Sequence, residues 1–552
     1  MKTKNPGALE GTEIVYLAKP FGGWSQSPVT INAVPHYSAS VEGLQGSLQK
    51  QTLNNYAESD GITLFRPEKF GHIAPGHIFG VATDAGSRVT SLPVNGGVDA
   101  NGLCWIVLSK GRLVQGGNEI PIVIAANYDP AMAGTHNTHT LTAGATSLNP
   151  DILVLYDLAT TPVQWIIWSW QDNTDGDISI IKNDGTGQVT TWYSALDAVL
   201  KTGIPLKMCQ GPDGNIYVTI GSSVQQIVVT AGLAAATKGK TLPLGAGWTA
   251  QGIVAFKNYV AIIASSTPSS FKRGETKVFL WDGLSTTING VTSTAANYSF
   301  PIPDNFGNGI FFGGTNLFAF TNGRNNSSKI FEFTGKGFKK IFESGLIGLS
   351  GGGIQGSLES YQDSLMIGGT KNSLGHLFRF YAGGFHDEGI ITDGTNQATS
   401  VGMVKNLFTN LLAVGVGYGA STYKIYTQTG FNQYQLNAAL RTILYTEGIL
   451  GRRLYPLGFK GTINRIQIFL SQWGAGASLT LSLYRDYDTT DLLAAKVVDT
   501  TTYPSGTNEI DLSDLAITDV SSFYMIITFS HALISNTAAI IRGMIIHWAP
   551  SQ

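Results

Sequence analysis

The sequence predicts an all-β protein: a six- or seven-bladed β-propeller followed by a C-terminal β-sandwich of the jelly-roll type, with an extended N-terminal segment. Composition is the first indication, since only 13% of the 552 residues are charged whereas 67 are glycine. Glycine reaches the positive φ values of tight turns, and long exposed helices would need more charged residues than this chain has. A repeat and an alternating pattern are the other two indications.

The repeat consists of short apolar runs that each end in a glycine turn. The turn glycines follow one another at intervals of about fifty residues, the length of a propeller blade with about four short strands. They are Gly185, Gly232, Gly283, Gly335, Gly383 and Gly430. A second apolar run precedes each glycine, often after a turn dipeptide such as Asp213-Gly214. Such units stack because one alone cannot bury both of its faces.

Six units can be counted between residues 150 and 437. The region 60–149 is less regular, but Leu103–Leu108 reads as a strand behind Asn101-Gly102 and indicates a seventh blade. We therefore assign residues 61–437 to the propeller. A stack of β-sandwiches is the alternative, because its strands also recur at short intervals.

The repeat stops near residue 438, where strands of alternating pattern begin. Residues 465–470, 478–483 and 523–529 alternate apolar and polar side chains with period two, which is typical of strands with one buried face. Residues 438–552 are predicted to form the β-sandwich. Residues 1–60 are polar with scattered apolar positions, and we assign them to a docking arm or to a segment that closes the propeller ring.

Charge and composition exclude several classes of function. The net charge is −2 with no basic block, which argues against sequence-specific nucleic-acid binding. No run reaches the ~18 apolar residues of a membrane span, and the N-terminus has no apolar signal-peptide region. Cys104 and Cys209 define no disulfide framework, so synthesis in a reducing cytosol is expected.

Three motifs suggest chemistry but lack the context that the chemistry needs. Gly348–Gly352 satisfies G-x-S-x-G around Ser350, but no helix follows to form a nucleophile elbow. Lys238–Thr241 resembles the end of a phosphate-binding loop without its first glycine. Asn173–Asp177 resembles part of a calcium loop, and a hairpin turn explains the same residues.

Metal and glycosidase sites are weighed in the same way. His136 and His139 are weak candidates for a metal site, since no third ligand lies near them in sequence. We predict no catalytic residues, no cofactor and no enzyme activity. A propeller glycosidase would need paired carboxylates brought together by the fold, which sequence alone does not show. Four tryptophans could stack on sugars or lie in the core, and the core is favoured: Trp165, Trp168, Trp170 and Trp192.

In layout and composition the chain resembles the tail and nozzle proteins of tailed bacteriophages. The resemblance rests on residues 60–70, 73–77 and 457–468 and on the order of docking segment, propeller and sandwich. It implies a non-catalytic structural component of the virion, made in the host cytoplasm. The expected partners are other virion or tail proteins, identical copies in a homo-oligomeric ring, and a host-surface glycan. A carbohydrate- or host-receptor-binding module is the alternative function, and a propeller glycoside hydrolase the third.

Overall fold

The computed structural model is built from β-strands, as the sequence predicts. Among the residues it describes, the helical element is a single 3-10 turn at Ala231–Leu233. None of the helices in the described part of the chain is long and apolar enough to cross a membrane. Besides the strands named below, the structure describes most continuously residues 206–233, 236–266, 274–288, 291–313, 315–322, 328–344, 461–485 and 490–513.

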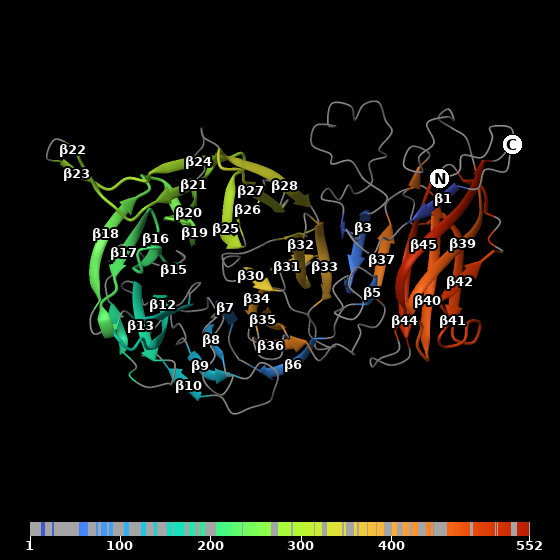
Figure 1. The fold of residues 1–552 in the computed structure, drawn as a ribbon, viewed down its shortest axis with the longest axis horizontal. Coiled ribbons are helices and arrows are strands. Elements are labelled where there is room, and N and C mark those ends of the chain that lie inside the picture. The colour runs from blue at the N-terminus through green and yellow to red at the C-terminus, as the bar shows by residue number, and fades with distance from the viewer. Residues whose placement is uncertain are drawn as a thin grey trace. The chain divides into compact units, whose positions relative to one another are not determined.

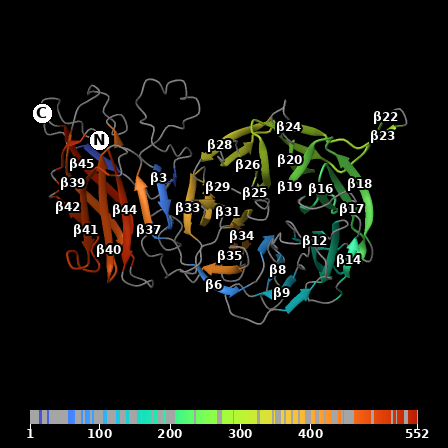
Figure 2. The same cartoon turned by 180° about the vertical axis from the view of Figure 1, so that it is seen from behind.

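The chain divides into two compact units. One comprises Met1–Ile78, Phe378–Gly389 and Thr429–Gln552, and the other comprises Phe79–Leu377 and Ile390–Gln428. The boundaries predicted from sequence, 61–437 and 438–552, remain a prediction. In the second unit, antiparallel four-stranded sheets follow one another around a common centre, and Figures 1 and 2 show this propeller from both sides.

The blades are numbered in chain order. Blade 1 contains β7 (Arg88–Ser91), β8 (Cys104–Ser109), β9 (Val123–Tyr128) and β10 (Asn137–Thr140). Blade 2 contains β11 (Ile152–Tyr156), β12 (Gln164–Gln171), β13 (Gly176–Lys182) and β14 (Val189–Tyr193). Blade 3 contains β15 (Met208–Gln210), β16 (Ile216–Ile220), β17 (Ser223–Val228) and β18 (Thr237–Pro243).

Blades 4 and 5 are the best described. Blade 4 contains β19 (Trp248–Phe256), β20 (Tyr259–Ser266), β21 (Thr276–Trp281) and β24 (Tyr298–Ile302), with the hairpin β22 (Thr286–Ile288) and β23 (Val291–Ser293) inserted before its last strand. Blade 5 contains β25 (Phe306–Gly313), β26 (Asn316–Asn322), β27 (Ser328–Phe333) and β28 (Phe338–Ser344).

Two further sets of strands follow. Blade 6 contains β30 (Leu358–Tyr361), β31 (Ser364–Lys371), β32 (Leu374–Tyr381) and β33 (Gly384–Ile390), with β29 (Ile347–Gly348) also paired to β31. The division between the two units falls within β32. Blade 7 contains β34 (Ser400–Lys405), β35 (Leu412–Tyr418) and β36 (Thr422–Gln428), and its fourth strand is β6 (Phe79–Asp84). The strand that completes blade 7 is therefore residues 79–84. It does not come from residues 1–60, which the sequence analysis considered for closing the ring.

The sequence repeat corresponds to the two middle strands of the blades. The turn glycines follow the third strand, and Gly232, Gly283 and Gly335 have φ values of 71°, 77° and 87°. The preceding apolar runs form the second strand. All five residues of β16 are buried, because neighbouring blades cover both faces of a middle strand. Such strands are continuous apolar runs rather than alternating ones.

Apolar side chains fill the space between successive blades. Between blades 3 and 4, Tyr217 and Leu242 pack in one cluster with Ile262 and Trp281. Between blades 4 and 5, the cluster includes Phe256, Ile263, Ile310 and Phe331 from both blades. Blade 4 thus has one face in each of two cores, which makes these cores depend on consecutive blades rather than on one sheet.

The other unit contains the β-sandwich. One sheet has β1 (Glu13–Tyr16), β45 (Ile540–Pro550), β39 (Gly461–Gln472) and β42 (Glu509–Leu512), with β43 (Ile517–Val520) also paired to β39. The facing strands are β37 (Ala438–Thr442), β44 (Ser522–His531), β40 (Ala477–Arg485) and β41 (Leu492–Asp499). Buried and exposed residues alternate along β39 and β40, so the predicted period-two pattern is confirmed. One apolar core joins the two sheets.

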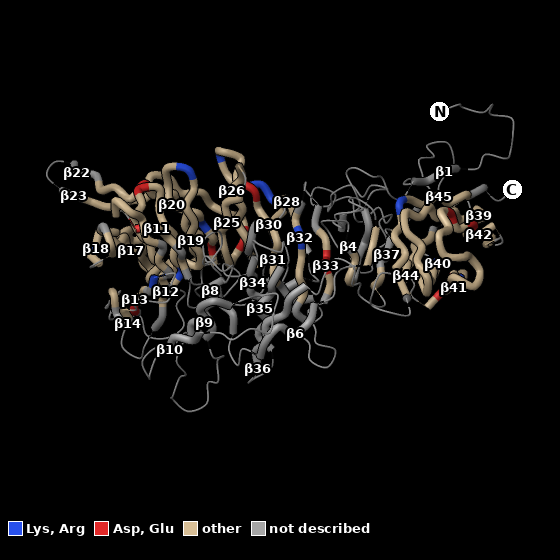
Figure 3. The backbone as a smooth tube through the Cα atoms, turned by 60° about the horizontal axis from the view of Figure 1, so that its bottom comes forward, with Lys and Arg blue, Asp and Glu red and all other residues tan. Residues whose placement is uncertain are grey.

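Charged residues are scattered along the described part of both units, with Lys and Arg positions interspersed among Asp and Glu positions (Figure 3). The described surface therefore offers no extended basic stripe of the kind that follows a nucleic-acid backbone.

Candidate functional site

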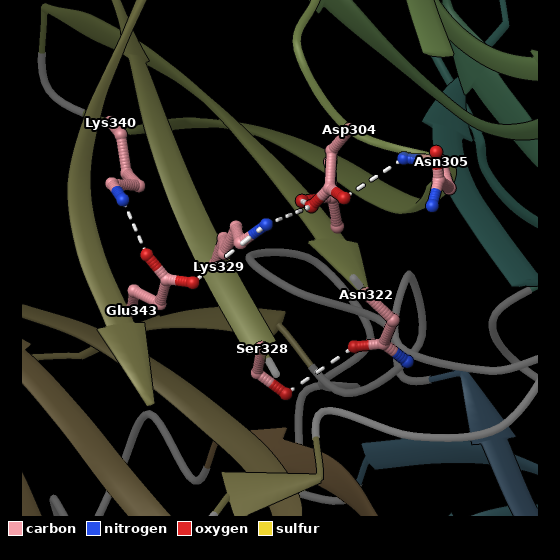
Figure 4. Close-up of polar contacts among 8 residues, drawn as sticks. Asp304, Asn305, Asn322, Ser328, Lys329, Lys340 and Glu343 are labelled. Atoms are coloured by element: carbon pink, nitrogen blue, oxygen red, sulfur yellow. Dashed lines mark hydrogen bonds and ion pairs between the residues drawn. The ribbon is translucent and has the colours of Figure 1, made fainter. Parts of the chain in front are cut away.

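A polar cluster lies at the end of blade 5 where β25 begins. We call it the strand-start site and define it by Asp304, Phe306, Asn322, Lys329 and Glu343. The Lys329 Nζ lies 3.4 Å from Asp304 Oδ2 and 3.8 Å from Glu343 Oε1, so one ammonium group bridges two carboxylates (Figure 4). The Lys340 ammonium group also pairs with the Glu343 carboxylate.

Strand register brings these residues together. Thr321 of β26 is opposite Lys329 of β27, and Lys329 is opposite Glu343 of β28. Directly paired residues on neighbouring strands project to the same face of a sheet. Asp304 lies in the connection before β25 and reaches the same face through its bond to Thr321.

The Asp304 carboxylate is buried, and both of its oxygens have partners. Its side chain is 3% exposed. The Thr321 hydroxyl donates to Oδ2 at 2.5 Å, and the Asn305 backbone N–H donates to Oδ1 at 2.9 Å. With Lys329 also at Oδ2, this carboxylate orders the surrounding groups.

An exposed aromatic ring lies at the same end of blade 5, on the other face of the sheet from Lys329 and Glu343. Phe306 is the first residue of β25, is 43% exposed, and is directly opposite Asn322 of β26. The Asn322 side-chain oxygen accepts a hydrogen bond from the Ser328 hydroxyl at 3.3 Å. In blade 4 the first residue of β19 is also aromatic, since Trp248 is opposite Ser266. Two consecutive blades therefore begin their first strand with an aromatic residue.

Buried hydroxyl groups hold the strand ends in place from blade to blade. Ser169 of blade 2 donates to the Leu206 carbonyl at 2.7 Å, and Ser265 of blade 4 accepts from the Gly307 N–H at 2.7 Å. Within blade 3, Thr219 accepts from the Lys207 N–H at 2.8 Å. The bond between Ser265 and Gly307 fixes the start of β25, next to Phe306.

The charges of the strand-start site balance. Together with Lys340, which pairs with Glu343, two lysines face two carboxylates, so the cluster offers hydrogen-bond donors and acceptors without a net charge. Such a site favours an uncharged polar ligand over an ion. In the part of the chain that the structure describes, no group of three or more His, Cys, Asp and Glu side chains is placed to hold a metal.

The metal candidates from the sequence have no described site. His136 lies outside the described residues. His139 is opposite Ile124 in the β9–β10 pair, and its side chain is outside the description. The predicted site at these two residues is therefore left as a prediction.

The structure describes two of the three sequence motifs, at least in part. Ser350 lies outside the described residues, and Lys238–Thr241 forms part of β18 rather than a phosphate-binding loop. Gln171 is opposite Gly176, which confirms the hairpin between β12 and β13. Asn173–Asp175, the residues of its turn, lie outside the description.

Two of the four tryptophans are core residues. Trp165 and Trp192 are 6% and 8% exposed, and their indole N–H groups donate to Asp157 Oδ2 and to the Leu233 carbonyl. The side chains of Trp168 and Trp170 lie outside the description. For the described pair, the preference for the core over a sugar-stacking role is confirmed.

A second charged cluster lies on β32 and β33 of blade 6 and is fully buried. The Arg379 Nε donates to Glu388 Oε1 at 2.6 Å, and both side chains are 3% exposed. Burial, together with the Arg379 charge, lowers the pKa of the neighbouring His386 to about 3. In such a buried pair each charge neutralises the other, so removing one partner leaves an unpaired buried charge and is strongly destabilising. The cluster is a structural feature, because its groups are enclosed by protein.

No model of a known protein family matches the chain, and a search of curated proteins finds no relative. Among solved structures, the Trypanosoma rangeli sialidase in complex with the inhibitor DANA is similar over 89% of this chain and 95% of that chain, with 8% identity and a TM-score of 0.33. An exo-beta-1,3-galactanase from Phanerochaete chrysosporium is similar over 89% and 99%, with 10% identity and a TM-score of 0.29.

The Swd1 propeller domain of Myceliophteria thermophila is similar over 63% of this chain and 99% of that chain, with 10% identity and a TM-score of 0.38. At such identities the likeness concerns the fold alone. The chain is a β-propeller protein, and no activity is carried over from these structures.

The comparisons correct the prediction of a phage structural protein. The similar structures are a sialidase, a galactanase and a Swd1 propeller, and nothing in them corresponds to a tail or nozzle protein. The architectural likeness misled because a propeller with a sandwich serves many functions, so fold alone does not identify one. The homo-oligomeric ring, the virion location and the absence of enzyme activity remain untested predictions.

Proposed function

We propose that this protein binds neutral carbohydrate at the strand-start site of blade 5. The observation that carries the proposal is the position of Phe306, an exposed ring at 43%, at the same edge of blade 5 as a group of side chains whose charges cancel. Binding sites for small organic ligands combine aromatic surface with a few well-placed polar groups. A sugar offers an apolar C–H face to the ring and hydroxyl groups to the lysines, amides and carboxylates.

Pre-organisation supports this function. Asp304, Lys329 and Glu343 hold one another in place before any ligand arrives, and Thr321 fixes Asp304 from the neighbouring strand. Groups that are already ordered lose little conformational entropy on binding. The site therefore suits recognition of a ligand with many weak hydrogen-bonding groups.

We propose binding without hydrolysis. Most glycosidases use two carboxyl groups, one that gives a proton and one that acts as base or nucleophile. Asp304 has both oxygens engaged, and Glu343 pairs with two lysines. Neither carboxyl group is presented to a glycosidic bond in the way that this chemistry needs.

A glycan array with the full chain tests the proposal, followed by calorimetric titration of the best neutral oligosaccharide. Phe306→Ala should weaken that binding by about tenfold or more, as expected for an aromatic anchor. The matched control is Tyr156→Ala, which removes another exposed ring, 57% exposed at the end of β11 in blade 2.

The control variant should bind as the unmodified chain does, and incubation with the bound oligosaccharide should release no reducing ends. Equal affinity of the Phe306→Ala variant and the unmodified chain would exclude this site. Steady release of reducing ends would show that the protein is a hydrolase and not a binding module.

A further inference from the structure

We propose that a second surface, on blades 4 and 5, binds an acidic polysaccharide. We call it the aromatic strip and define it by Tyr259, Tyr298, Phe300, Phe333 and Phe338. Each ring contacts the next: Tyr259 meets Tyr298 with ring centres 5.8 Å apart, and Tyr298 and Phe300 are nearly parallel at 6.3 Å. Phe300 meets Phe333 at 5.0 Å, and Phe333 meets Phe338 at 5.2 Å.

The aromatic strip is far along the strands from the strand-start site. In blade 4, Trp248 pairs with Ser266 at one end of the β19–β20 hairpin, and Phe256 pairs with Tyr259 at the other. Tyr298 is opposite Leu280, close to that second end. The two surfaces are therefore separate, and the second proposal does not depend on the first.

The rings of the aromatic strip are exposed to solvent to different degrees. Tyr298 is 53% exposed, and the other four rings are partly exposed. Phe300, Phe333 and Phe338 pack on the buried cluster between blades 4 and 5, whereas Tyr298 extends the row of rings into solvent. Contiguous exposed aromatic surface marks interaction sites in proteins. The row of rings is elongated, which suits a chain of sugar rings better than a single small molecule.

The polar groups beside the strip select for negative charge. Lys257 lies with its Nζ 5.3 Å from the centre of the Phe256 ring, and Lys336 is exposed in the turn between Phe333 and Phe338. Neither lysine has an ion-pair partner among the described residues. The nearby acids keep their charge: Asp282 accepts hydrogen bonds from the neutral Leu284 and Asn297 groups, and Glu332 is opposite Lys339 of β28. Lys257, Lys336 and Lys339 therefore outnumber these two acids.

The net positive charge beside the strip favours a ligand that carries carboxylates. An extended aromatic strip with two unpaired lysines therefore fits a polymer of uronic acids. Its sugar faces would lie on the rings, and its carboxylates would approach the lysines. An acidic peptide shares the charge but lacks the regular flat C–H faces, and it is the competing outcome of the test.

The experiment is affinity electrophoresis of the full chain in gels containing polygalacturonate, with dextran and polyglutamate as matched polymers. Polygalacturonate should retard the protein, whereas dextran should not and polyglutamate should do so at least fivefold more weakly. Tyr298→Ala should weaken polygalacturonate binding by about tenfold. Lys257→Asn should weaken it about threefold and reduce its salt dependence, and asparagine tolerates the left-handed φ of 53° at this position.

Tyr156→Ala and Phe306→Ala are the controls, and both should keep the affinity for polygalacturonate. Circular dichroism checks that each variant is folded. The proposal is overturned if polygalacturonate does not retard the protein or if Tyr298→Ala is retarded equally. Equal retardation by polyglutamate would assign the surface to acidic peptides instead. Loss of binding in Phe306→Ala alone would move the acidic ligand to the strand-start site.

Discussion

The hydroxyl oxygen of Tyr217 in blade 3 occupies the place where a side chain at Gly283 of blade 4 would begin. A Cβ at position 283 would lie 2.0 Å from that oxygen. Tyr217 is fully buried, its ring meets the Trp281 ring edge-on at 5.3 Å, and its hydroxyl donates to Asp213 Oδ2 at 2.8 Å. The close approach of the two blades therefore depends on a glycine whose φ is +77°.

Gly283→Ala should lower the free energy of unfolding by about 2–4 kcal/mol, because it adds a steric clash to an unfavourable left-handed backbone. Gly335→Ala is the control: Gly335 has a φ of +87°, but a Cβ there would meet no atom within 4 Å. It should cost only about 1–2 kcal/mol. Thermal unfolding followed by circular dichroism measures both, and equal losses would show that the Tyr217 contact has no effect.

Lys329→Met should destabilise the propeller by about 1–3 kcal/mol. The substitution removes the ammonium group next to the Asp304 carboxylate, whose side chain is 3% exposed, and leaves that charge buried with neutral donors. Lys340→Met is the matched control, because the Lys340 side chain is 34% exposed and its pair with Glu343 is on the surface. That change should cost less than about 1 kcal/mol. Urea unfolding of both variants decides, and a larger loss for Lys340→Met would contradict the interpretation.

Asp157→Ala should destabilise blade 2 by about 1–3 kcal/mol at neutral pH, since the buried Trp165 indole N–H would lose its acceptor. Burial alone would raise the pKa of Asp157, but hydrogen bonds from Val163, Trp165 and Ala159 outweigh it and lower the pKa. The stabilisation is therefore present above about pH 4 and is lost as the pH falls through the folded-state pKa. Unfolding at stepped pH should show the two proteins converging in acid, and a constant difference would refute this account.

Most of the propeller could be predicted from the sequence because its turns and apolar strands are marked by residues close together in the chain. Asp213-Gly214 marks the bend between β15 and β16, and Gly283 and Gly335 mark the turns after the third strands, where only a left-handed backbone fits. The two middle strands of a blade are read from adjacent residues. The strand that completes blade 7, Phe79–Asp84, pairs with Thr422–Gln428, and no local pattern connects segments so distant in the chain.

The strand-start site was not predictable in the same way. Asp304, Lys329 and Glu343 are unremarkable charged residues in sequence, and they meet only because Thr321, Lys329 and Glu343 share a register across three strands. A usable signal was the hydroxyl residue near the end of the second strand in blades 4 and 5, Ser265 and Thr321. The function predicted from overall resemblance failed because layout does not specify side-chain chemistry.

His386 should make stability depend on pH in the mildly acidic range. Burial, with the Arg379 charge, lowers its pKa to about 3 in the folded protein, whereas an unfolded chain has a histidine pKa of about 6.5. Between these values the unfolded state binds one more proton, so the stability falls by up to about 1.4 kcal/mol for each unit of pH decrease. His386→Gln keeps a polar side chain but cannot take up this proton.

The slope of unfolding free energy against pH between about pH 6 and 4 should therefore be shallower in the His386→Gln variant by about one proton. Urea unfolding at half-unit pH steps gives both slopes, and the Arg379–Glu388 pair, present in both proteins, cancels in the comparison. Equal slopes would mean that His386 takes up its proton in the folded state as readily as in the unfolded chain. The buried cluster would then accommodate a positively charged imidazole, contrary to this prediction.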